Sequence, residues 1–254
     1  MLLARWLSTL LFIIALPVFL VLTNVRIAAS EPRVQRYGFE QYEVAAVTGV
    51  SRVELDRAAT DIARYFSDGR EALSLRVQRE GEEVALFNPR EVAHMRDVKS
   101  LMQFFFRVQE LTFAYLVGFV GLTVLWARER SMRRFAQLSM VTGIVTASVL
   151  LVAALAMLVG FEQLFLQFHL ISFSNDLWQL DPATDRLIQM FPLPFWFDVS
   201  LGVGVLSVME GGLLALAGFA YLRWTDRGPW RRGFGDLEGR ATAARLGITS
   251  RNAR

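Results

Sequence analysis

Cysteine is absent from this 254-residue sequence, and histidine occurs only twice. Without cysteine, the chain cannot form disulfide bonds, thiolate metal sites or a thioester acyl intermediate. Imidazole chemistry is limited to two positions. Charged residues make up only 20% of the chain, against roughly 25% in an ordinary globular domain, whereas hydrophobic residues reach 54%. This composition excludes a soluble enzyme and a disordered chain.

Four apolar segments are long enough to cross a membrane, because a hydrocarbon layer of about 30 Å requires about 20 helical residues. The first segment has a second interpretation as a cleaved signal peptide. Its uncharged stretch of 18 residues is longer than the usual core of about 7–15 residues, which favours a retained helix. We therefore predict four transmembrane helices, over residues 1–27, 105–127, 135–160 and 195–222.

Arginine is unevenly distributed between the segments that connect these helices. Residues 128–134 contain four arginines and one glutamate, and residues 223–254 contain eight arginines and three acidic residues. Residues 28–104 contain 11 basic and 13 acidic residues, and residues 161–194 contain four acidic residues and one arginine. Because arginine-rich connections stay in the cytoplasm, we predict both termini on the cytoplasmic side and the other two connections outside.

Residues 28–104 are expected to form a small extracytoplasmic domain. Ser51 and Glu54 have the spacing of a helix capping box. The helix that follows has an apolar face that includes Val53, Ile62 and Phe66. This pattern predicts a helix from about residue 52 onward.

The rest of this domain predicts a β-hairpin and the start of another helix. Apolar and polar residues alternate over residues 73–77, and a turn over residues 80–83 precedes the apolar residues 84–87. Asn88 and Pro89 then have the character of an N-cap and a first helical residue. We expect this helix to run toward the second transmembrane segment, and the domain to be mixed α/β.

The connection over residues 161–194 is expected to begin as a helix at the membrane surface. Leu164, Phe165, Phe168 and Ile171 share one apolar face. The predicted fold class is therefore an all-α polytopic membrane protein with four transmembrane helices. A small mixed α/β domain lies between helices 1 and 2, and an interfacial helical loop lies between helices 3 and 4.

Both histidines fall on the outer side of this topology. His94 has Glu91 and Asp97 three residues away on either side, so either carboxylate would share its helix face. A single histidine in such a position is more often a partly hydrated packing residue, but the occurrence of both on one face favours function. Two histidines with aspartates could also bind zinc or iron, but no HxxxH or HxH spacing is present, so we expect no metal.

Glu210 lies inside the fourth apolar segment, where a carboxylate is costly unless it is protonated or paired. We expect it to hydrogen-bond across helices with Thr142, Thr146 or Ser148 of the third segment.

Two motifs resemble a known family. The first is Glu91-x-x-His94-Met95-x-Asp97-Val98-Lys99, and the second includes Asn175-Asp176-Leu177-Trp178 and ends near Met190-Phe191-Pro192. With four spans in this order, residues 1–222 resemble the lipoprotein intramolecular transacylase (Lit) family of bacterial integral membrane proteins. The resemblance implies a bacterial cell membrane location with the active site on the extracytoplasmic face.

The resemblance also implies a reaction. Such enzymes move the sn-2 acyl chain of a diacylglyceryl lipoprotein to the α-amine of its N-terminal cysteine, which gives the lyso-form. Two histidines are implied as catalytic, and they correspond to His94 and His169. We assign His169 as general base and His94 as acid or oxyanion-side partner, although the order is open, and Asn175 as oxyanion donor. The supporting or substrate-binding candidates are Glu91, Asp97, Asp176, Trp178, Asp185 and Asp198. Asp97 or Glu91 would orient His94, and Asp176, Asp185 and Asp198 are candidates for holding the free amine or orienting His169.

No cofactor is expected for this reaction, and the partners are the diacylated lipoprotein and membrane lipids, with no nucleic acid. Two other functions fit the same residues. One is a metal-dependent membrane hydrolase that uses the histidines and aspartates as ligands. The other is a non-enzymatic lipid- or lipoprotein-binding membrane protein with structural histidines. A transporter fits least, because three of the four spans have essentially no central charged group.

Overall fold

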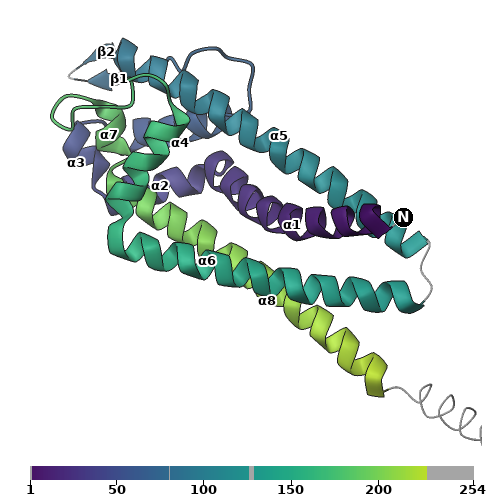
Figure 1. Cartoon of the computed structure of the whole chain (residues 1–254). Helices are drawn as coiled ribbons and strands as arrows, with labels where there is room; N and C mark the ends of the chain where they lie inside the picture. Colours follow the sequence, from purple (N-terminus) through teal and green to yellow (C-terminus); the bar gives the residue numbers. More distant parts are fainter. Residues whose placement is uncertain (1, 80, 126–128, 228–254) are drawn as a thin grey trace, which may run out of the picture.

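The computed structural model describes residues 2–79, 81–125 and 129–227 (Figure 1). Most of the predicted cytoplasmic tail and part of the 128–134 loop therefore lie outside the described residues. The described chain contains helices and one two-stranded antiparallel sheet. The elements are α1 (Leu2–Ser30), α2 (Pro32–Gln41), α3 (Val44–Thr48), α4 (Arg52–Tyr65), β1 (Arg76–Arg79), β2 (Glu82–Ala85), α5 (Pro89–Leu125), α6 (Glu129–Ser172), α7 (Arg186–Met190) and α8 (Leu193–Arg227).

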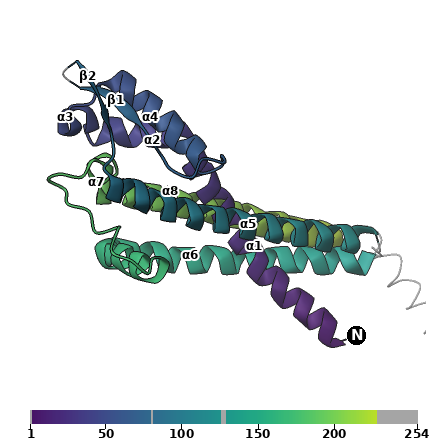
Figure 2. The same ribbon diagram turned by 90° about the horizontal axis from the view of Figure 1, so that it is seen from above.

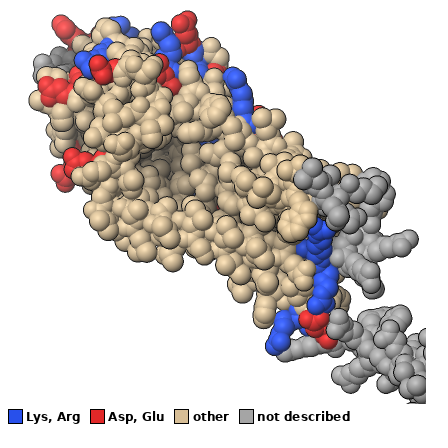
Figure 3. All heavy atoms as spheres, viewed as in Figure 1, with Lys and Arg blue, Asp and Glu red and all other residues tan. Residues whose placement is uncertain are grey.

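The four long helices α1, α5, α6 and α8 are long and apolar enough to cross a membrane. Figure 1 shows them side by side, with the short elements gathered at one end and both ends of the described chain at the other. Viewed from above, α1 crosses the other long helices at an angle (Figure 2). On the face that Figure 3 shows, the surface between the two charged ends is almost free of charged side chains. The predicted class, a four-helix membrane protein with a small domain at one end, is confirmed.

Helices α6 and α8 pack closely through small residues. A Cβ atom added at Gly143 of α6 would overlap the carbonyl oxygen of Gly211 of α8. A Cβ atom added at Gly218 of α8 would meet the carbonyl oxygen of Ala136. Lipid tails are as apolar as the side chains of the helices, so burial of apolar side chains between two helices gains little free energy in a bilayer. Close approach of the helix backbones is then a main source of helix association.

We expect Gly143→Leu to destabilise the bundle by about 1–3 kcal/mol, because the added side chain forces α6 and α8 apart. The matched control is Gly202→Leu in α8, where an added Cβ atom meets nothing within 4 Å. Reversible unfolding in mixed micelles would measure both changes. Equal stability of the two variants would contradict the close packing at Gly143.

Helix α6 changes direction at Gly160, whose backbone is not helical (φ −160°, ψ 55°). The segment that follows, residues 161–172, is the helix predicted after the third span, and it is continuous with α6 across the kink. Several of its apolar side chains are exposed, including Leu170 and Ile171, the latter by 83%. An exposed apolar face next to a span is what a helix at the membrane surface requires.

The small domain is built largely as the sequence predicts. The backbone N–H of Glu54 donates to Ser51 Oγ (3.3 Å), which caps α4. The core-facing side of α4 includes Leu55 and Ile62, both buried, but not Val53. The prediction for Val53 is wrong, since its side chain lies in the first turn of α4 and is 62% exposed.

The predicted hairpin is present as β1 and β2, with Arg79 paired with Glu82. Gly81 in the turn has φ +88°, a conformation that glycine adopts without steric cost. Alternate residues before and along β1, Leu73, Leu75 and Val77, are buried in the domain core.

The membrane-spanning part contains a polar cluster between α1 and α8. Asn24 Nδ2 lies 3.0 Å from both Ser207 Oγ and Glu210 Oε2. The expected partners of Glu210 on the third span are therefore wrong, because the carboxylate faces α1. Thr142 and Thr146 are buried on α6, and Thr146 Oγ1 donates to the carbonyl oxygen of Thr142.

Candidate active site

Helix α5 begins with a reciprocal cap that brings its first turn against α7. The backbone N–H of Glu91 donates to Asn88 Oδ1 (3.0 Å), and the backbone N–H of Asn88 donates to Glu91 Oε2 (2.7 Å). Glu91 Oε1 accepts from the backbone N–H of Leu187 (2.5 Å). The side chain of Glu91 is thus buried and used by backbone donors. Glu91 therefore does not hydrogen-bond to His94, and its expected role of orienting that ring is corrected.

The two histidines meet at the end of the bundle that carries the short elements. His94 comes from the second turn of α5, and His169 comes from the segment of α6 beyond the kink. Their ring centroids lie 6.2 Å apart, and the side chains are 6% and 8% exposed. Within the described chain, no hydrogen bond joins the two rings. The spacing therefore leaves each ring able to exchange a proton with a third group.

The tautomer of His169 follows from its partner. His169 Nδ1 lies 2.8 Å from the carbonyl oxygen of Phe165, one turn earlier in the same helix. A carbonyl oxygen only accepts, so Nδ1 carries the proton. In the neutral ring the lone pair is then on Nε2, which is the nitrogen able to accept a proton from another molecule. This arrangement suits a general base.

His94 has a different environment. Its Nδ1 atom is buried without a hydrogen-bond partner among the described residues, and neither Glu91 nor Asp97 bonds to the ring. An unsatisfied buried polar atom costs about 1–3 kcal/mol and is uncommon outside functional sites. The edge of the Phe173 ring packs against His94 at 5.2 Å between centroids. The imidazole of His94 is therefore held by packing, and its Nδ1 atom has no hydrogen-bond partner among the described residues.

Aromatic side chains enclose the pair. Trp178 lies 5.1 Å from His169 between ring centroids, which places this sequence-predicted residue at the site. Phe165 and Phe168 also contact His169. The sequence interpretation missed Phe173, which contacts both histidines. Phe173 lies directly after the last residue of α6, four residues beyond His169, and this spacing is the signal that could have identified it.

A loop from α6 to α7 is attached beside the histidines. Asn175 Nδ2 donates to Asp97 Oδ2 (2.9 Å), and Asn175 Oδ1 accepts from the backbone N–H of Leu177 (3.0 Å). Arg90 Nη2 donates to the carbonyl oxygen of Asp176 (2.5 Å). Asp97 and Asn175 are thus brought together, three residues along α5 from His94. Asp176 is exposed, and its carboxylate accepts from the side chain of Gln179 (3.3 Å).

Asp185 acts on the loop and not on a histidine. Its Oδ1 accepts from Asn88 Nδ2 (2.8 Å), and its Oδ2 accepts from the backbone N–H of Asp181 (2.8 Å). With Glu91, it joins the start of α5 to the start of α7. Asp185 does not contact His169, so this expected role is corrected to one of holding the loop.

Asp198 also makes no hydrogen bond to either histidine. Its Oδ2 accepts from the hydroxyl groups of Tyr37 (3.0 Å) and Tyr42 (2.6 Å), which attaches the α2 region to the start of α8. Burial and the hydrogen bond to Asp198 raise the pKa of Tyr42 to about 12. This tyrosine therefore stays a hydrogen-bond donor throughout the physiological range. Asp198 does not contact His169, and its other expected role, holding the substrate amine from the N-terminal part of α8, stays a prediction.

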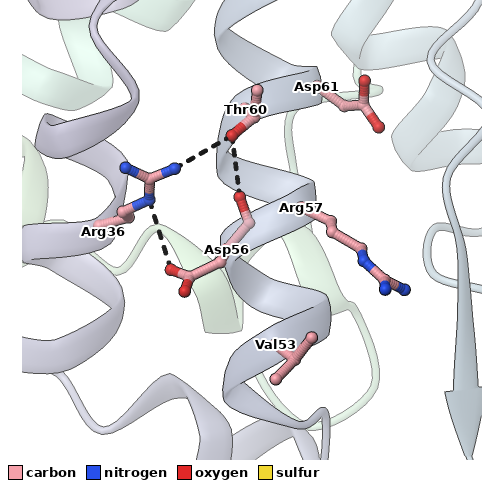
Figure 4. A pocket seen from close by; sticks show the side chains of 6 residues that line it. All are labelled: Arg36, Val53, Asp56, Arg57, Thr60 and Asp61. Carbon is pink, nitrogen blue, oxygen red and sulfur yellow. Dashed lines mark hydrogen bonds and ion pairs between the residues drawn. The ribbon is translucent and has the colours of Figure 1, made fainter.

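The histidine site contains two imidazoles and carboxylates that are committed to other partners. Among the described residues, no group of three or more histidines, aspartates or glutamates has the geometry to hold a metal ion. A separate surface hollow of about 420 Å³ lies between α2 and α4 (Figure 4). Arg36 there pairs with Asp56 and Thr60, so its polar groups largely satisfy one another. None of the site residues named above lines this hollow.

The sequence and the fold are both similar to known proteins. Residues 10–196 match the family described as Lipoprotein intramolecular transacylase Lit. An uncharacterized protein of Aquifex aeolicus (strain VF5) is 27% identical over an alignment of 228 positions, and the match covers 84% of this chain and 94% of that protein.

Two solved structures of the membrane-integral lipoprotein intramolecular transacylase Lit from Bacillus cereus have the same fold. The first has a TM-score of 0.68 at 18% identity and covers 87% of this chain and 96% of its own. The second carries a histidine-to-alanine replacement, has a TM-score of 0.66 at 18% identity, and covers 87% of this chain and 94% of its own. Since the family match spans most of the sequence, the chain belongs to the lipoprotein intramolecular transacylase Lit family.

Proposed function

We propose that this enzyme moves the sn-2 acyl chain of a diacylglyceryl lipoprotein to the α-amine of the lipoprotein's N-terminal cysteine, with His169 and His94 as proton-transfer groups. Membership of the family makes the chain an acyltransferase, a lipoprotein intramolecular transacylase. The observation that carries the finer proposal is the meeting of the chain's two histidines, whose ring centroids lie 6.2 Å apart at the end of the bundle that carries the short elements.

The reaction needs no acyl-enzyme, since the amine and the ester belong to one substrate. The amine nitrogen attacks the ester carbonyl carbon through a ring of eight atoms, a new N–C bond forms, and the C–O bond to the glyceryl oxygen breaks. An orientation that favours this closure contributes up to about 7–11 kcal/mol in the best intramolecular systems. The enzyme must remove a proton from the amine and supply one to the glyceryl oxygen.

In this proposal His169 takes the first proton. Its Nδ1–H is held by Phe165, so Nε2 accepts the proton from the amine. The imidazolium formed at His169 donates the second proton to the leaving glyceryl oxygen, or His94 donates it and is then reprotonated by that imidazolium. In both cases one proton leaves nitrogen, one reaches oxygen, and the enzyme ends the cycle unchanged. Phe165, Phe173 and Trp178 exclude water, which disfavours hydrolysis of the ester.

Asn175 is proposed as the oxyanion donor. One N–H of its side-chain amide is used by Asp97, and the other remains for the tetrahedral oxyanion. Asp97 thereby orients Asn175, while Asp176 remains a candidate for holding the substrate amine because its carboxylate is exposed.

The test is mass spectrometry of a lipoprotein N-terminal peptide, made with and without this enzyme. Transfer leaves the total number of acyl chains unchanged and moves one chain to nitrogen. Hydrolysis would instead remove one acyl chain, and a binding protein would leave the peptide unaltered. Either of these results would reject the proposed reaction.

We also propose that both termini are cytoplasmic and that the histidine site lies on the extracytoplasmic side. Since the chain has no cysteine, single cysteines can be placed at Ser51, Ser131 and Ser250. We expect a membrane-impermeant thiol reagent, applied to intact cells, to label only the cysteine at position 51. Labelling at position 131 from outside would contradict this orientation and the location of the site.

A further inference from the structure

Lysine occurs once in the sequence, at position 99, and its side chain is buried. Lys99 Nζ lies 2.6 Å from the carbonyl oxygen of Arg70, 2.9 Å from the carbonyl oxygen of Asp68 and 3.1 Å from Asp68 Oδ1. The ammonium group has three N–H donors, and each has an acceptor. The ammonium also lies over the ring of Tyr65, 4.2 Å from its centroid.

The partners of Lys99 belong to one short segment that follows α4. Burial alone would raise the pKa of Asp68, but hydrogen bonds from Arg70 and Lys99 outweigh it and lower the pKa. Asp68 is therefore a carboxylate opposite the ammonium across the neutral range. A buried charge whose hydrogen bonds are all formed tolerates little displacement, because any shift of the Lys99 ammonium leaves one of the hydrogen-bonding groups unpaired.

Lys99 and His94 lie on opposite flanks of the same helix. Lys99 follows His94 by five residues, which is about 140° around the axis of α5. Between these flanks, Met95, Val98 and Met102 pack against the core of the small domain. Apolar packing alone permits small rotations of a helix. Glu91 holds the first turn of α5 against α7, and the three hydrogen bonds of Lys99, about two turns further along, restrict the rotation of the helix to one angle.

We propose that Lys99 is a positioning residue of the transacylase, which fixes the rotation of α5 and so the distance from His94 to His169. This inference rests on the proposed role of His94. A side chain about 6 Å from the helix axis moves by about 1 Å when the helix turns by 10°. A misplacement of that size at a reacting group can cost about 10²-fold in rate. Lys99 thus acts on the reaction through His94, without touching the substrate.

The experiment measures kcat, KM and the amount of folded enzyme for Lys99→Met. We expect kcat per folded enzyme to fall about 10- to 100-fold with KM nearly unchanged, because the loss is in the alignment of the reacting groups. In a His94→Ala background, Lys99→Met should add little to the loss of rate, since the group it positions is already absent. Lys99→Arg, which keeps the charge, should recover part of kcat.

A second readout uses the two histidines as probes. In ¹⁵N-histidine-labelled enzyme, Lys99→Met should shift the imidazole signals of His94. The matched control is Asn24→Leu, which removes another buried hydrogen-bonding side chain, between α1 and α8. It should lower stability but leave kcat per folded enzyme and the His94 signals unchanged. If Lys99→Met does not fold, the same two measurements are made on Lys99→Arg, whose longer side chain should still shift the signals and lower kcat.

The outcomes separate the two claims. A wild-type kcat and unchanged His94 signals in the Lys99 variants, with His94→Ala inactive, would overturn the positioning role and leave the proposed function intact. Full activity of His94→Ala would overturn the proposed function, and the positioning role with it. An equal loss of kcat in Asn24→Leu would also overturn the inference, because it would make the effect of Lys99 one of general stability.

Discussion

Replacement of either histidine by alanine is expected to remove most of the transacylase activity without unfolding the protein. Each imidazole is assigned a proton transfer, and such a transfer typically contributes about 10²–10⁴-fold to the rate. His94 and His169 make no hydrogen bond to each other, so neither is needed to hold the other in place. The amount of lyso-form peptide produced per folded enzyme is the measurement for His94→Ala and His169→Ala.

The double variant provides a sharper comparison. If the histidines act in one proton-transfer mechanism, the loss in the double variant should be little greater than in either single variant. Asn175→Ala should lose less, on the order of 10²–10³-fold, as a single oxyanion donor. Ser174→Ala is the control, since Ser174 is an exposed neighbour in the same loop. Wild-type amounts of lyso-form from either His→Ala variant would reject the mechanism.

The second large effect is expected on stability, at Glu91. Its carboxylate accepts from two backbone N–H groups, those of Asn88 and Leu187, and its side chain is 1% exposed. In Glu91→Ala these donors lose a charged acceptor in a buried position, which should cost about 3–5 kcal/mol in the free energy of unfolding.

The matched variant is Glu91→Gln, which keeps one carbonyl oxygen and should cost about half as much. Unfolding in mixed micelles gives both free energies, and hydrogen exchange at the amide of Leu187 reports the lost contact directly. An unchanged unfolding free energy in Glu91→Ala would show that the α5–α7 junction does not depend on this carboxylate.

Features with local causes were predictable from the sequence. Ser51 caps α4 and Asn88 caps α5, because each cap needs only side chains within three residues. The hairpin turn at Gly81 likewise follows from neighbouring residues. The four long helices follow from apolar length alone. The meeting of His94 and His169 was predicted only as a shared side of the membrane, and the family resemblance supplied their pairing.

Features with distant causes were not predictable. Glu91 shares a helix face with His94, yet its direction is set by the backbone of Leu187, 96 residues away. Asp198 looked free to serve the site, but Tyr37 and Tyr42 use it, from segments more than 150 residues earlier. In each case the sequence gives the correct polar residue and cannot show which partner the fold brings to it.

The contact of Asn24 with Ser207 and Glu210 has a consequence for biosynthesis. Its acceptors are 183 and 186 residues further along the chain, so α1 enters the membrane long before they are made. Until then its amide has no acceptor on α8, and an unsatisfied polar group in lipid costs several kcal/mol. The side-chain amide of Asn24 in the first span therefore gains these acceptors only when the last span, α8, is in place. A chain that stops before α8 retains an unpaired polar group inside the bilayer, and this distinguishes an unfinished protein from a finished one.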